Sequence, residues 1–483
     1  MDESRVKHLV GRSLAWVGGA TMAISVLDVL SSVLLTVLWI SPTELGVAAI
    51  ALWIFPVVSA FAEAGLGASI VQRDSTSEEA ISSLFWLNVA LSVVASVILF
   101  AGADLIAGHP TAAAMLRVYS IKLLLDNTYF VPAALMRREL RFPELSVIRV
   151  VANVVLVGGR LGFAAAGFGP WCFLFGLLGH MLVTAIGTQI CHPWRPRFVF
   201  RWRECAAMVR FGWKTALREI LFHVYVNADY RVVYAFFGAA ATGVYRFAYE
   251  RILDPVRSVS LVVTDVAFPT FSRLATRREA VVEQFVRFTR ANLLAVAPAM
   301  ALVAITADDL IRLVWPDVQW RGAVTPMQIL CIVGVLRSLS FVLPALFDGL
   351  GRPGVPLLYT LIAAVVLPGS YVLCAWLLGP RFGFVSVAIA WAIGYPIAFL
   401  ILLGLALREL RLPFSQYLRG IAGVPICIAG ASVAAFAFRA LAMPLPPGAR
   451  LGLVTVVFAA LLLPLLARFE GITPRAVLQS VRG

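Results

Sequence analysis

Ionisable residues recur at helical spacing inside segments that are otherwise apolar. Between residues 206 and 237, four polar residues are spaced by 4, 7 and 4 positions and so share one helical face: Lys214, Arg218, Tyr225 and Asp229. Five residues are interpreted as cations without an acidic partner one turn away: Lys214, Arg218, Arg149, Arg160 and Lys122. Such cations can bind an anion, and a guanidinium can hold phosphate oxygens in a bidentate manner. We therefore predict an anion-binding site formed by these five residues and Arg257.

A second polar stripe runs through the segment 240–267. Its members follow steps of 4, 4, 3 and 8 residues: Arg246, Glu250, Asp254, Arg257 and Asp265. The first two members, and likewise the third and fourth, can form ion pairs within one helix, so a structural role stays open beside a functional one. A charged stripe on an otherwise apolar helix indicates that the helix lines a water-filled passage.

Four carboxylates are candidates for ion coupling or gating: Asp28, Glu63, Asp229 and Asp265. A carboxylate inside a membrane can bind Na⁺, carry a proton or form a salt bridge to another helix. Asp28, Glu63 and Asp265 have no obvious local cation, and for them these alternatives stay open. His223, which is close to Glu219 in the chain, is a weaker candidate for a proton relay.

Motifs for covalent chemistry are absent from the sequence. There is no nucleotide-binding loop, no HExxH and no Ser/His/Asp elbow. The six cysteines have neither CxxC nor Cys/His spacing and are interpreted as packing residues: Cys172, Cys191, Cys205, Cys331, Cys374 and Cys427. We expect no catalytic residue, no metal and no cofactor.

The composition shows what class of protein contains these ionisable residues. The chain has 483 residues, of which 61% are hydrophobic and 14% charged, and its mean hydropathy is +0.90. A soluble protein has roughly 45–50% apolar and about 25% charged residues. In water, this chain would expose too much apolar surface. We predict an all-α integral membrane protein, which excludes nucleic-acid binders, cytosolic enzymes and secreted disulfide scaffolds.

About fourteen transmembrane helices are predicted, because a span needs about 20 mostly apolar residues. They lie near 14–39, 45–71, 82–107, 113–135, 143–167, 169–190, 206–237, 240–267, 285–307, 323–349, 355–379, 382–407, 417–440 and 450–468. The spans 113–135, 206–237 and 240–267 carry charges and are the weakest in hydropathy. The net charge is +14, and arginines concentrate in alternate loops. The other loops hold little beyond Arg312, Arg321, Arg381, Arg439 and Arg450. By the positive-inside rule, both termini are cytoplasmic.

An internal repeat relates the two halves of the chain. The stretch 39–47 lines up with 236–244, and Asp104 lines up with Asp309, at the same places in the order of spans. Because six spans separate the copies, the halves have the same orientation and form two bundles related by an axis along the membrane normal. The predicted parts are an N-terminal lobe, a C-terminal lobe and a further C-terminal helix pair with a tail: 1–200, 201–411 and 412–483. Two pseudo-symmetric six-helix lobes around a central cationic cavity are the architecture of an alternating-access transporter.

Several motifs resemble those of a known family. They are Phe61–Arg73 with Ser83–Asn88, Arg138–Phe142, Asn227–Asp229, Gly243–Tyr245 and Phe268–Leu274. The chain resembles Wzx-type polysaccharide flippases of the multidrug/oligosaccharidyl-lipid/polysaccharide superfamily. One residue departs from the pattern, because the family usually has Asp where Glu63 stands.

The resemblance implies a multi-pass carrier in the bacterial inner membrane. It would flip undecaprenyl-diphosphate-linked oligosaccharide repeat units for capsule, exopolysaccharide or O-antigen (lipopolysaccharide) assembly, without covalent chemistry. A cationic lumen would receive the diphosphate headgroup, and Na⁺, H⁺ or the membrane potential would drive transport. A polysaccharide polymerase and a chain-length regulator are the protein partners that this implies.

Three other functions stay open. A peptidoglycan-precursor flippase also has fourteen spans, and a multidrug/cation antiporter of the same superfamily usually has twelve. A membrane glycosyl polymerase or ligase is an alternative of another class. That enzyme is expected to carry a long outer loop with catalytic arginines, which this sequence lacks.

Overall fold

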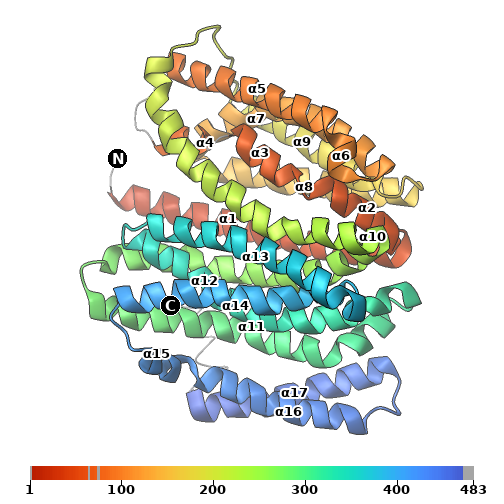
Figure 1. Ribbon diagram of the computed structural model, residues 1–483. Helices are drawn as coiled ribbons and strands as arrows, with labels where there is room; N and C mark the ends of the chain where they lie inside the picture. Colours follow the sequence, from red (N-terminus) through yellow and green to blue (C-terminus); the bar gives the residue numbers. More distant parts are fainter. Residues whose placement is uncertain (1–2, 64–65, 73–76, 471–483) are drawn as a thin grey trace. The chain divides into compact units, whose positions relative to one another are not determined.

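The computed structural model describes residues 3–63, 66–72 and 77–470, and the regular structure in these ranges is helical (Figure 1). The first ten helices are α1 (Glu3–Leu38), α2 (Pro42–Leu52), α3 (Phe55–Glu63), α4 (Leu66–Gln72), α5 (Glu78–Ala101), α6 (Ala103–Ala107), α7 (Pro110–Arg138), α8 (Phe142–Ala165), α9 (Trp171–Cys191) and α10 (Trp202–Leu274). After them come α11 (Arg278–Val314), the short 3-10 helix η1 (Val318–Ala323), α12 (Val324–Gly349), α13 (Gly354–Phe382), α14 (Val385–Glu409), α15 (Phe414–Ile421), α16 (Gly423–Leu441) and α17 (Pro447–Glu470). The prediction of an all-α protein is confirmed.

Two compact units divide the chain, residues 1–243 and 244–483. The boundary falls within α10, which consists of two helical arms, 202–237 and 239–274, joined at Gly238. Gly238 has φ 81° and ψ −177°, a conformation that glycine adopts readily because it has no Cβ. The predicted lobes 1–200 and 201–411 stay a prediction.

Eleven helices in the described part of the chain are long and apolar enough to cross a membrane, so the protein is a multi-pass membrane protein. The three other predicted spans coincide with α7 and with the two arms of α10. α7 has 29 residues and is therefore about 43 Å long, more than the ~30 Å of a hydrocarbon core. These helices are long enough to span a membrane, but their charged residues make them less apolar than the other eleven. The count of fourteen spans stays a prediction.

Local capping signals start the helices where the predicted spans begin. Ser41 and Glu44 form a capping box at the start of α2: the Ser41 N–H donates to Glu44 Oε2 at 2.9 Å, and the Glu44 N–H donates to Ser41 Oγ at 3.3 Å. Pro42 occupies the first turn, where its missing N–H costs no hydrogen bond. Ser77 caps α5 in the same way, by accepting the N–H of Ala80 at 3.1 Å.

The helix pairings of the first unit recur in the second. In the first unit α5 packs on α7, α8 on α9, and α7 on α9. In the second unit α11 packs on α12, α13 on α14, and α12 on α14. In the predicted order of spans these are the pairs 3–4, 5–6 and 4–6, followed by 9–10, 11–12 and 10–12. The recurrence agrees with the internal repeat.

In each unit, a buried asparagine joins two paired helices: α5 to α7 in the first unit, and α11 to α12 in the second. In the first unit, Asn88 Nδ2 of α5 donates to Asn127 Oδ1 of α7 at 2.5 Å. In the second unit, Asn292 Nδ2 of α11 donates to the Ser338 carbonyl of α12 at 2.6 Å. Both asparagines are buried, so both halves use a polar link between the same pair of helices.

Two stretches that correspond in the repeat contact each other within the first unit. A Cβ on Gly46 of α2 would lie 1.8 Å from the Ala239 carbonyl oxygen of α10. A Cβ on Gly243 would lie 1.7 Å from the Pro42 carbonyl oxygen. Gly46 and Gly243 occupy corresponding positions in the aligned stretches, and so do Pro42 and Ala239. Only glycine allows the two backbones to approach this closely.

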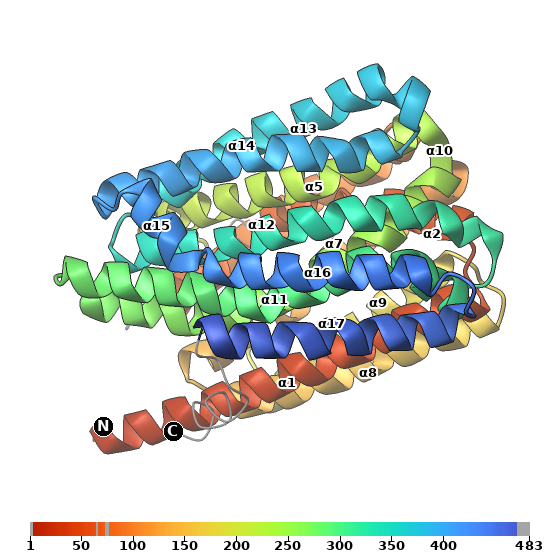
Figure 2. The ribbon, with the colours of Figure 1, turned by 90° about the horizontal axis from the view of Figure 1, so that it is seen from below.

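The C-terminal helices α16 and α17 pack against each other and against α11 (Figure 2). Asp309 of α11 accepts from Arg439 Nε at 2.7 Å and from Arg450 Nε at 2.5 Å. The neighbouring Asp308 accepts from Arg312 Nε at 2.9 Å. Three of the arginines that stood out in the predicted outer loops are therefore paired with two adjacent carboxylates.

Candidate functional site

Lys122 lies buried in the first unit, with 5% of the residue exposed. Its Nζ donates to both carboxylate oxygens of Asp126, at 2.8 and 2.7 Å, and lies 4.9 Å from the centre of the Phe55 ring. Tyr129 donates its hydroxyl to the same carboxylate at 3.0 Å. The expectation that Lys122 lacks an acidic partner is wrong, because Asp126 stands one turn further along the same helix.

Glu63 belongs to the same region of the first unit as Lys122. It ends α3, it is exposed, and it interacts electrostatically with Asp126, Arg137 and Lys122. Two residues that were predicted separately, Glu63 as a coupling acid and Lys122 as an anion ligand, therefore belong to one charged cluster.

Asp28 of α1 faces the polar side of α8. Asn153 Nδ2 donates to Asp28 Oδ1 at 3.3 Å, and Arg160 Nη1 lies 4.0 Å from the same oxygen. The Arg160 guanidinium also lies 5.7 Å from the centre of the Phe173 ring. Of the alternatives open for Asp28, the structure shows the salt bridge to another helix. The distance is at the limit for an ion pair, and both side chains are partly exposed (24% for Arg160 and 43% for Asp28), so an anionic ligand can compete with Asp28 for Arg160.

His180 of α9 is a residue that sequence reasoning missed. It is half-buried and interacts electrostatically with Lys122 and Asp126 of α7, Arg160 of α8 and Asp28 of α1. It therefore lies within electrostatic range of two charged pairs, Lys122–Asp126 and Arg160–Asp28. A lone histidine on an apolar helix gives little signal in a sequence, since most such residues are packing residues.

Arg149, which shares a face of α8 with Arg160 by spacing, is exposed. No ion pair links it to any other residue that the structure describes. Arg149 is therefore accessible to an anionic ligand.

The first arm of α10 holds Arg218 and Asp229. Arg218 is half-buried, and Asp229 is fully buried, where its Oδ1 accepts the N–H of Tyr230 at 2.8 Å. His223 Nε2 lies 4.0 Å from Glu219 Oε2. Lys214 is within the helix, but its side chain lies outside the described residues.

The second arm of α10 belongs mostly to the second unit and carries the second stripe. Arg246 Nε lies 2.5 Å from Glu250 Oε1, which confirms the ion pair within the helix. Further along, the stripe is exposed at Asp254, Arg257 and Asp265. The opposite side of the arm is buried through Tyr249, Ile252, Leu253 and Val256. The stripe therefore faces away from the core of the second unit.

Arg337 of α12 is a second missed residue, and only 4% of it is exposed. Its Nη1 donates to the Tyr249 hydroxyl at 2.9 Å, and its guanidinium lies 5.3 Å from the centre of the Trp391 ring. It ties the second arm of α10 to α12 and α14. Its signal in the sequence is a single arginine within a long apolar segment, and an ionisable residue in such a segment marks a functional candidate.

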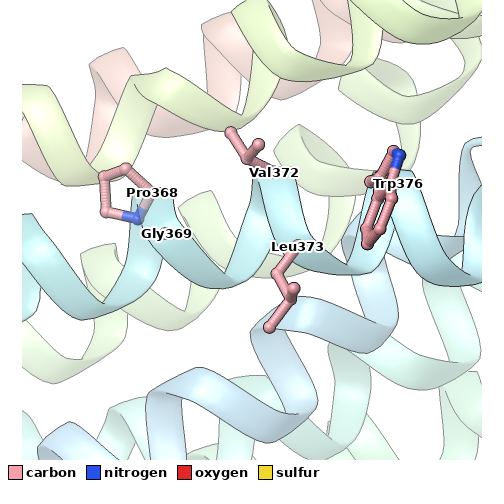
Figure 3. Close-up of a pocket in the computed structure, with 5 residues that line it drawn as sticks. All are labelled: Pro368, Gly369, Val372, Leu373 and Trp376. Carbon is pink, nitrogen blue, oxygen red and sulfur yellow. The ribbon is translucent and has the colours of Figure 1, made fainter.

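The described residues include no group of three or more His, Cys, Asp or Glu side chains that could hold a metal ion. A groove of about 580 Å³ lies on α13 and is lined by Pro368, Gly369, Val372, Leu373 and Trp376 (Figure 3). These lining residues carry no charged side chain, so the groove suits hydrocarbon rather than a charged headgroup.

Comparisons with known proteins place these observations in context. The family described as "Polysaccharide biosynthesis protein" matches residues 36–325. The chain is 28% identical to the teichuronic acid biosynthesis protein TuaB of Bacillus subtilis, over 65% of this chain and 67% of that protein. It is 26% identical to the lipopolysaccharide biosynthesis protein WzxC of Escherichia coli, over 72% of each chain. The succinoglycan biosynthesis transport protein ExoT of Rhizobium meliloti is 27% identical, over 68% of this chain and 67% of that protein.

Solved structures share the fold. The lipid II flippase MurJ in an inward closed conformation superposes with a TM-score of 0.70 and 14% identity, over 91% of this chain and 98% of that chain. An inward-facing multidrug resistance transporter of the MATE family superposes with a TM-score of 0.60 and 16% identity, over 80% and 95%. At such identities the likeness shows the fold alone.

Proposed function

Because the chain belongs to the polysaccharide biosynthesis protein family, as the resemblance of its motifs implied, we propose that it flips undecaprenyl-diphosphate-linked oligosaccharide repeat units across the bacterial inner membrane. The polymer is a capsule, an exopolysaccharide or O-antigen. The names of TuaB, WzxC and ExoT support this, because each refers to synthesis or transport of a cell-surface polysaccharide. The protein performs no covalent chemistry and needs no cofactor. The family match is the observation that carries the proposal.

We propose that this chain works by alternating access. The two units repeat the same helix pairings, and the exposed charges of the second arm of α10 face away from the core of their unit. We propose that the chain carries the headgroup by alternating access, with both chain termini in the cytoplasm. A polysaccharide polymerase and a chain-length regulator are the proposed protein partners.

The diphosphate is held, in this proposal, by Lys214, Arg218, Arg149, Arg160 and Arg257. The exposure of Arg149 and Arg257 on their helices supports this assignment. Lys122 keeps Asp126 as its partner and acts through the charged cluster rather than as a free cation. Coupling or gating is assigned to Asp28, Glu63, Asp229 and Asp265.

The weak pair of Arg160 and Asp28 offers a way to couple the headgroup to an ion. A diphosphate that binds Arg160 competes with Asp28, whose oxygen is 4.0 Å away. Asp28 then loses a stabilising cation and can bind a coupling cation in its place. By linkage, the bound ion in turn strengthens binding of the diphosphate to Arg160.

Replacement of Arg218 by Ala tests the proposed function. We expect polysaccharide export to fall at least about tenfold while the amount of protein in the membrane is unchanged, because a charged hydrogen bond contributes about 1.5–3 kcal/mol. Arg408→Ala is the matched control, since Arg408 is exposed at the end of α14 and is not assigned to the site. Normal export by the Arg218 variant would contradict the assigned site. If cells need the gene for peptidoglycan synthesis, and therefore for growth, rather than for polysaccharide export, the peptidoglycan-precursor flippase would be favoured.

A further inference from the structure

The first arm of α10 carries arginines before the predicted substrate site begins. Arg203 and Arg210 are seven residues apart, and Arg218 follows after eight more. At 3.6 residues per turn, these three positions lie within one side of the helix, and position 214 lies on the same side. Arg203 and Arg210 are both exposed. A row of basic positions therefore runs from the first turn of α10 up to the predicted site.

The opposite side of this arm is anchored in the first unit. Cys205 and Met208 are buried in a core cluster with residues of α4, α5 and α7, among them Leu66, Leu84 and Val131. Positions 205 and 208 are 140–200° around the helix from position 203, at about 100° per residue. The burial of one side therefore directs the arginines away from the core of the first unit.

Exposed aromatic rings border the arginines. Trp202 and Trp213 are 52% and 49% exposed, and eleven residues, about three turns, separate them. Phe198 and Phe200 are exposed in the preceding linker. Tryptophan in such positions marks the membrane interface, where lipid headgroups lie. The aromatic rings beside these arginines therefore favour a place for Arg203 and Arg210 near the depth of lipid phosphates.

The linker before α10 has a defined conformation. Arg197 N–H donates to Ser82 Oγ at 3.1 Å, and Trp86 Nε1 donates to the Arg197 carbonyl at 2.8 Å. Glu204, the acid next to Arg203, accepts from Ser77 Oγ at 2.8 Å and also pairs with Arg201. The hydrogen bond from Ser77, followed by that from Arg201, lowers the pKa of Glu204 from its usual value. The Glu204 carboxylate is therefore bound by Ser77 and Arg201 rather than by Arg203.

We propose that Arg203 and Arg210 form an entry site for the diphosphate headgroup of a polyprenyl-linked glycolipid, from which the headgroup passes along α10 to Arg218. The proposal rests on the proposed function. Seven residues of helix rise by about 10 Å, a span that two arginine side chains can bridge onto one diphosphate. The diphosphate carries more charge and more acceptor oxygens than the single phosphate of an ordinary phospholipid, so it can engage both guanidinium groups.

A binding measurement tests the entry site. The purified full-length protein in phosphatidylcholine nanodiscs is titrated with undecaprenyl diphosphate, and the change in intrinsic tryptophan fluorescence reports binding. We expect the double variant R203Q/R210Q to bind at least tenfold more weakly than the unaltered protein. R195Q is the matched control, because Arg195 is an exposed arginine of the linker that contacts Gln189 instead, and its affinity should be unchanged.

The outcomes separate the entry site from the proposed function. Unchanged binding by R203Q/R210Q would overturn the entry site alone. An equal loss of phosphatidylglycerol binding, measured in parallel, would also overturn it, because the arginines would then contact any anionic lipid surface. Failure of the unaltered protein to bind undecaprenyl diphosphate would overturn both proposals. If the double variant does not fold, R210Q alone replaces it, with a loss of at least about threefold expected and unchanged binding again contradicting the entry site.

Discussion

Asp104 and Asp309 occupy corresponding positions in the repeat, yet their surroundings differ. The side chain of Asp104 is 71% exposed and forms an ion pair with Arg117 at 2.5 Å. Asp309 is fully buried and forms ion pairs with Arg439 and Arg450. The difference arises because α16 and α17 cover α11 in the second unit, whereas the described residues of the first half of the repeat include no equivalent pair of helices. The repeat sets the helical frame, and the added helices decide which of its charges are buried.

The largest effect is expected for Asp309→Asn. The change removes the carboxylate charge from the buried Arg450 and from Arg439, which is partly buried and also lies 3.6 Å from Asp308. Breaking a buried ion pair in this way costs about 3–5 kcal/mol. We expect the midpoint of thermal unfolding in detergent to fall by several degrees, and proteases to cut between α15 and α17 more readily. If the unfolding midpoint moves as little as it does for Asp104→Asn, the two aspartates do not differ in the way that their burial implies.

The buried asparagines sharpen the comparison, since they test what the two halves have in common. Asn88→Ala and Asn292→Ala each remove one buried hydrogen bond, and each should lower the free energy of unfolding by about 1–2 kcal/mol. The loss should be greater for Asn88, because Asn127 Oδ1 loses its Asn88 donor, whereas the Ser338 carbonyl belongs to a helix. Denaturant unfolding of both variants in the same detergent measures this. A negligible effect at one site only would show that the halves do not share this link.

The smallest effect is expected for Asp104→Asn. An exposed ion pair contributes about 0–1 kcal/mol, because water and salt screen it. The unfolding midpoint should therefore move by about a degree or less, and added salt should reduce even that difference. A large, salt-independent loss would mean that Asp104 is as important to the first unit as Asp309 is to the second.

Much of the fold could be predicted because its signals are local. Hydropathy and spacing placed the helices, and the four-residue step from Arg246 to Glu250 predicted an ion pair that is confirmed. The same step joins Lys122 to Asp126, so this pair was within reach of the sequence and was overlooked. The charges of α7 and α10 lowered hydropathy without preventing helix formation, since backbone hydrogen bonds close within each helix.

The candidate site was less predictable because its partners are distant in the chain. Arg160 is 132 residues from Asp28, and Arg337 is 88 residues from Tyr249. Spacing along one helix says which positions share a face, but not which face of another helix they meet. Arg160 was therefore predicted as a free cation, and Arg337 was not considered.

By itself, the sequence determined that the chain is a helical membrane protein with a repeat and with cations on helical faces, because composition and periodicity act within a single segment. Only the tertiary structure decided which charges are neutralised and which stay exposed. Asp309 receives Arg439 and Arg450 from helices more than a hundred residues away, while Arg203 and Arg210 remain at the surface because the other side of their helix is packed. The physical reason is that the energy of a charge depends on burial and on its neighbours in space, and helix packing brings those neighbours together.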